Sequence, residues 1–102
     1  MPKICADYTD DAALMGEIGV LTGELLSVTP DCDADTMSTL LTQASCLLDM
    51  AHRNVQETRA IVNTDTAQKL YRQQRILGEA ISMYKYAETK TKAVIGHIEL
   101  KS

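Results

Sequence analysis

Residues 33–62 read DADTMSTLLTQASCLLDMAHRNVQETRAIV, and they carry the clearest helical pattern in the chain. Its apolar positions recur in alternating steps of four and three residues, which is the spacing of one face of an α-helix. They are Met37, Leu41, Ala44, Leu48, Ala51, Val55, Thr58 and Val62. Leu40 and Leu47 widen this face. Because Asp33 is a good N-cap residue, the pattern predicts a helix over residues 34–62.

A second helix is predicted before this one, over residues 10–28. Thr9 is the candidate N-cap, and Asp10 and Asp11 then lie in the first turn, where the helix dipole favours acidic side chains. Pro30 is expected to end the helix, because the residue before a proline is disfavoured in the α conformation. The predicted apolar face consists of Leu14, Ile18, Leu21, Leu25 and Val28.

A third helix is predicted over residues 66–99. It follows a break at residues 63–66, NTDT, where Asn63 suits the left-handed end of a helix and Thr64 or Asp65 can cap the next one. Its predicted apolar face consists of Leu70, Leu77, Ala80, Ile81, Tyr84, Ala87, Thr91, Val94, Ile95 and Ile98.

The three patterns together predict an all-α protein. No alternating strand pattern of useful length occurs, and 102 residues suffice for a single domain over residues 1–102. Short breaks make consecutive helices antiparallel neighbours. We therefore predict an up-down three-helix bundle dominated by a hairpin of residues 34–62 and 66–99, with the first helix packed along one end. Since Phe and Trp are absent, the core must be largely aliphatic.

Composition excludes several classes of protein. No apolar run approaches the roughly 20 residues that a membrane helix needs, and the first residues contain no apolar segment of a secretory signal. The three cysteines, Cys5, Cys32 and Cys46, form no C-x-x-C pair, and an odd number favours reduced thiols. A net charge of −4 argues against direct nucleic-acid binding. We expect a cytoplasmic protein that binds no membrane.

The charge is unevenly distributed along the chain. Residues 1–35 contain eight acids and one base, whereas residues 64–102 contain four acids and seven bases. Two explanations are open at this stage. The two ends attract each other inside one bundle, or the acidic third forms a patch for a basic partner.

Motifs that carry chemistry are missing. No phosphate-binding loop, zinc-protease motif or nucleophile elbow occurs, and the chain has two histidines, His52 and His97. Residues 31–35, DCDAD, resemble the start of a calcium loop, but Thr36 and Thr42 occupy the positions that require Gly and Glu. We therefore expect no catalytic residue, no metal site and no cofactor, and the chain is not expected to be an enzyme.

Two helix surfaces are candidate contact sites. Gly16, Gly19 and Gly23 lie opposite the apolar face of residues 10–28, and each glycine inside a helix costs about 1 kcal/mol relative to Ala. Close approach of another helix, from this chain or a second one, would explain them. The alternative is that poor helix formers are merely tolerated here.

The second surface is a strip on residues 66–99 that points away from the apolar face. At 100° per residue it contains Tyr71, Arg75, Ser82, Tyr86 and Lys90. Tyr and Arg are enriched at the centres of protein interfaces, so we expect a partner-binding strip, although half-exposed tyrosines are also common on helices. The same arithmetic places Tyr84 in the core and Tyr86 at the surface.

Two stretches resemble known proteins. Residues 28–35, VTPDCDAD, followed by residues 40–48, LLTQASCLL, resemble small all-helical bacterial proteins of unknown function, a resemblance that implies fold and no activity. The C-terminal third is similar to the ends of type III secretion inner-rod and needle subunits, which are helical hairpins. Their usual interhelical proline is absent from residues 63–66. As a class, the chain is also similar to short acidic phage and mobile-element inhibitors such as anti-CRISPR proteins.

These observations favour a non-enzymatic protein-interaction module. Its most concrete form is a small inhibitor or adaptor that occupies a surface of a larger bacterial complex, as anti-CRISPR proteins do. The alternatives are a structural helical-hairpin subunit of the rod or needle kind, and a small-ligand sponge. A protein partner is expected, and a homodimer stays open.

Overall fold

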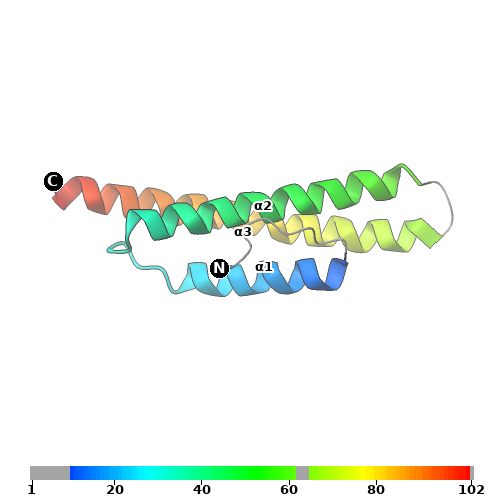
Figure 1. Cartoon of the computed structure of the whole chain (residues 1–102), viewed down its shortest axis with the longest axis horizontal. Coiled ribbons are helices and arrows are strands. Elements are labelled where there is room, and N and C mark those ends of the chain that lie inside the picture. Colours follow the sequence, from blue (N-terminus) through cyan, green and yellow to red (C-terminus); the bar gives the residue numbers. More distant parts are fainter. Residues whose placement is uncertain (1–9, 62–64, 102) are drawn as a thin grey trace.

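The computed structural model describes residues 10–61 and 65–101 and contains three helices: α1 (Asp11–Leu26), α2 (Ala34–Arg59) and α3 (Asp65–Lys101). No strand occurs in these residues. Helices α2 and α3 form a long antiparallel hairpin, and α1 lies against both of them (Figure 1). The predicted all-α bundle is confirmed.

The cap of α1 differs from the prediction. Asp10 is the N-cap, and its side chain accepts a hydrogen bond of 3.0 Å from the backbone N–H of Ala12. Thr9 lies outside the described residues. The helix ends at Leu26, before the predicted end at residue 28, because the Ser27 hydroxyl donates to the carbonyl of Glu24 and its N–H group closes the last turn. Helix α1 therefore ends before Pro30, and its end does not depend on the proline alone.

The other helix ends follow the prediction more closely. Asp33 caps α2 as predicted, with its carboxylate accepting from the backbone N–H of Asp35. Helix α2 ends at Arg59 with Ala60 as the C-cap, short of the predicted residue 62. Val62, Asn63 and Thr64, which entered the prediction of this break, lie outside the described residues.

Helix α1 runs along the middle of the hairpin, whereas the prediction placed it along one end (Figure 1). Two long-range hydrogen bonds fix its position. The Gln73 amide donates to the Asp11 carboxylate at 3.1 Å, and the Lys90 ammonium group donates to the Val28 carbonyl at 2.9 Å. The last turns of α3 therefore extend beyond the start of α2, and the bundle measures 57 × 25 × 19 Å.

The core confirms the predicted face of α1 and most of the predicted face of α2, and it corrects that of α3 in part. Leu14, Ile18, Leu21 and Leu25 are buried, with Val28 packed against them. On α2, Leu40 and Leu47 are buried, whereas Leu41 and Leu48 are only half-buried. The buried face of α2 is centred closer to Leu40 and Leu47 because α2 must contact both α1 and α3.

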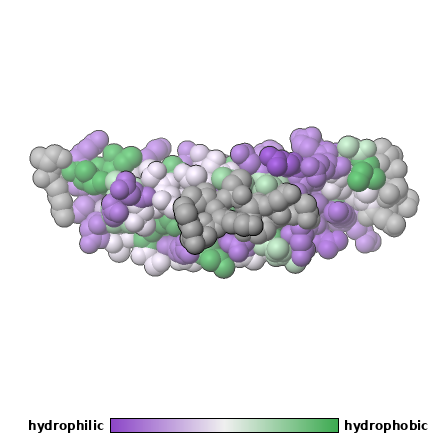
Figure 2. Space-filling model, viewed as in Figure 1, coloured by the Kyte–Doolittle hydropathy of each residue, from purple (hydrophilic) through white to green (hydrophobic). Residues whose placement is uncertain are grey.

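Helix α3 shows the same shift. Ile76 and Met83, outside the predicted face, are buried, while Ile95 and Ile98, within it, are exposed. Apolar groups accordingly reach the surface near both ends of the molecule (Figure 2). The prediction was wrong at these positions because one apolar face cannot describe a helix with two neighbours.

Candidate functional site

The predicted strip on α3 has an exposed part and a half-buried part. Tyr71, Arg75 and Ser82 are exposed, with Tyr71 67% accessible. Tyr86 and Lys90 are half-buried, and Tyr86 packs against the core cluster. The strip therefore does not form one continuous exposed surface.

Lys90 links the segment that follows α1 to α3, and it also contacts the Tyr86 ring. The hydrogen bond from Lys90 to the Val28 carbonyl places a cation just beyond α1, at the negative end of its dipole. The same ammonium group lies 5.4 Å from the centroid of the Tyr86 ring, which is a cation–π distance. These contacts give both residues a structural role within the chain.

Tyr84 and Tyr86 are both half-buried and both pack against the core, which corrects the expectation that one is buried and the other exposed. We expect Tyr86→Ala to lower the free energy of unfolding by more than about 1 kcal/mol, because it removes ring packing and the cation–π contact. Tyr71→Ala is the matched control and should change it by less than about 0.5 kcal/mol. Urea unfolding followed by circular dichroism measures both. Equal, small effects would contradict the half-buried placement of Tyr86.

A groove lies between the start of α1 and the N-terminal half of α3. Its volume is about 340 Å³. Buried Ile76 is part of its wall, and the remaining lining residues are exposed or half-buried. They are Asp11, Ala12, Met15, Arg72, Arg75, Ile76 and Glu79. Arg75 is the member of the predicted strip that the structure brings into this groove.

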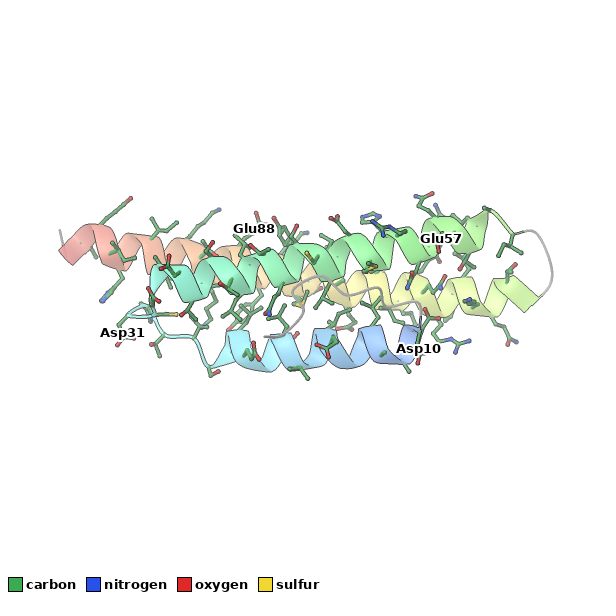
Figure 3. The ribbon with its side chains drawn as sticks, viewed as in Figure 1. Asp10, Asp31, Glu57 and Glu88 are labelled. Atoms are coloured by element: carbon green, nitrogen blue, oxygen red, sulfur yellow. The ribbon has the colours of Figure 1, made fainter. Side chains whose placement is uncertain are left out.

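Charges around the groove are not paired with one another. Among the described residues, neither Arg72 nor Arg75 forms an ion pair, although Asp11 and Glu79 line the same groove. The Asp11 carboxylate instead accepts from Gln73, and Asp10 caps α1 beside α3 (Figure 3). Packing of acidic α1 against basic α3 thus occurs without ion pairs between them in this part of the chain.

The three glycines of α1 are exposed and make no close helix contact within the described chain. A Cβ atom added at Gly16, Gly19 or Gly23 would have nothing within 4 Å. Val20 and Leu26 are 58% and 65% exposed on the same side. We name these five residues the outward face of α1. Close approach of another described part of the chain therefore does not explain the glycines.

In residues 10–61 and 65–101, no three His, Cys, Asp or Glu side chains lie close enough to hold a metal ion. Cys32 and Cys46 are half-buried and form no disulfide, and Cys5 lies outside the described residues. Asp33 acts as a helix cap, which accounts for one acid of the calcium-loop-like stretch.

Sequence reasoning found Arg75 but missed the groove around it. Arg72 and Met15 contribute to it from helices whose relative position was not predicted. The signal available in the sequence was that α1 is apolar on both faces, which leaves Met15, Val20 and Leu26 unexplained by a single core face.

None of the helices in the described chain is long and apolar enough to cross a membrane. The chain matches no family model, and no curated protein or solved structure is detectably similar to it.

Proposed function

We propose that this chain is a non-enzymatic protein-interaction module of the cytoplasm. In its most concrete form it is a small inhibitor or adaptor that occupies a surface of a larger bacterial complex, as anti-CRISPR proteins do. The observation that supports this proposal is the outward face of α1. It is exposed, uncharged and lined by glycines whose Cβ positions are open.

The energetics of α1 favour a missing neighbour. Three glycines inside one helix cost roughly 3 kcal/mol relative to alanines, which is a large part of a small domain's stability. One side of α1 contacts α2 and α3, and the outward face is left for a second molecule that approaches its backbone closely (Figure 1).

Charge at the edge of this face indicates the kind of partner. Glu17 and Glu24 flank it, Asp10 and Asp11 precede it, and α1 contains no base. None of these four acids forms an ion pair with another described residue. A partner helix with small apolar residues at its centre and Lys or Arg at its edges would be complementary.

Gly19→Leu tests the proposed surface. We expect the variant to fold, with an unfolding free energy up to about 1 kcal/mol higher, because Leu is a better helix former and the space is open. It should nevertheless lose the partner that the wild-type chain retains when purified from its native cell. Mass spectrometry identifies that partner, and light scattering reports self-association.

Gly78→Leu is the matched control, because Gly78 is an exposed glycine of α3 with open Cβ space. It should gain similar stability and retain the partner. If the wild type, Gly19→Leu and Gly78→Leu all retained the partner, the outward face of α1 would be excluded as the binding surface. If the wild-type chain retained no protein, the proposed function itself would be contradicted.

A structural helical-hairpin subunit is the second candidate, and the C-terminal end of α3 favours it. Ile95, Ile98 and Leu100 are exposed there beside an uncharged groove of about 240 Å³ at the start of α2. Such an end would suit contact between copies. Light scattering of the wild-type chain distinguishes the two candidates, because a polymerising subunit would not behave as an 11.2 kDa species.

A further inference from the structure

We propose that the groove between α1 and α3 binds a segment of a protein partner in which a large apolar side chain lies next to a carboxylate. The apolar side chain would contact Met15 and Ile76, and the carboxylate would bind Arg72 and Arg75. This inference rests on the proposed function, because it names the chemistry of the partner that the module binds.

The two arginines supply the anion-binding part of the groove. They lie three residues apart on one side of α3, so both guanidinium groups can approach one ligand. Among the described residues neither is used in an ion pair. A guanidinium group presents donors in a planar fork that matches a carboxylate, which makes a partner's Asp or Glu the complementary group.

Of the two acidic lining residues, Asp11 is already hydrogen-bonded and Glu79 alone opposes this preference. Asp11 already accepts a hydrogen bond from Gln73 at 3.1 Å, and the groove lies at the N-terminal end of α1, where the helix dipole is positive. Glu79 lies four residues after Arg75 and is exposed, so it competes with an incoming carboxylate. Removal of its charge should therefore strengthen binding of an acidic segment and weaken binding of a basic one.

The form of the groove favours a protein over a small molecule. About 340 Å³ is near the lower limit for a small-molecule pocket, and such pockets usually enclose most of the ligand. Here five of the seven lining residues are exposed. Full burial of the inserted side chain therefore requires a partner surface that covers the rim, as at interface hot spots.

Selection from a displayed library of random short peptides on the full-length chain tests the inference. We expect the enriched peptides to combine Asp or Glu with a neighbouring Leu, Ile, Met or Phe. Fluorescence anisotropy should show about tenfold weaker binding of such a peptide to Arg72→Gln and to Arg75→Gln. Glu79→Gln should bind it more tightly. Arg53→Gln, an exposed arginine on α2, is the matched control and should bind like wild type.

The position of the bound peptide has its own readout. Methyl resonances of Met15 and Ile76 should shift on titration, and those of Ile95 and Leu100 should not. Enrichment of basic peptides, no enrichment at all, equal binding by the arginine variants, or weaker binding by Glu79→Gln would overturn the inference. If any of these occurs while Gly19→Leu still abolishes partner capture, the groove inference fails and the proposed function stands.

Discussion

Leu25→Ala is expected to lower the free energy of unfolding by about 2–5 kcal/mol. Leu25 is 0% exposed on the inner side of α1, within the core that the three helices share. Truncation removes apolar contacts and leaves a cavity that the rigid α2–α3 hairpin cannot close completely. Urea unfolding of the purified variant, followed by circular dichroism, measures the loss.

The adjacent leucine provides the control. Leu26 is 65% exposed, and Leu26→Ala should change the free energy of unfolding by no more than about 0.5 kcal/mol at protein concentrations where the chain is monomeric. A larger loss for Leu26→Ala than for Leu25→Ala would show that α1 is rotated relative to the described arrangement, and the outward face of α1 would then be part of the core.

Ala87→Leu is expected to destabilise the bundle by about 1–3 kcal/mol, through the opposite effect. The core includes four alanines that are 0–1% exposed, namely Ala44, Ala51, Ala80 and Ala87. Small side chains at such positions let α2 and α3 approach closely. A leucine at position 87 has no free volume to enter and must displace the neighbouring helix or adopt a strained rotamer.

Ala93→Leu separates overpacking from helix propensity. Ala93 is exposed on the same helix, so its replacement should change the free energy of unfolding by about 0.5 kcal/mol or less. Thermal unfolding of both variants gives the comparison. If Ala87→Leu were as stable as Ala93→Leu, the α2–α3 interface near Ala87 would contain space that the described packing does not leave.

The candidate site was only partly predictable. Arg75 and Tyr71 were selected by helix arithmetic, and the structure leaves both exposed. The same arithmetic placed Tyr86 and Lys90 beside them, but Tyr86 packs against the core and Lys90 binds the Val28 carbonyl just after α1. A helical projection shows which residues share a side of one helix. It contains no information about which neighbouring helix covers that side.

The three helices, the cap at Asp33 and the inner face of α1 were predictable from residue order alone, because spacing and capping act within a few residues. The packing of the helices was needed to show that Leu40 and Leu47 are more buried on α2 than Leu41 and Leu48. It also decided that α1 lies along the middle of the hairpin, where Arg72 and Arg75 form a groove with Met15. These features depend on how three apolar faces divide their contacts, and that division minimises exposed apolar area over the whole bundle rather than along any one helix.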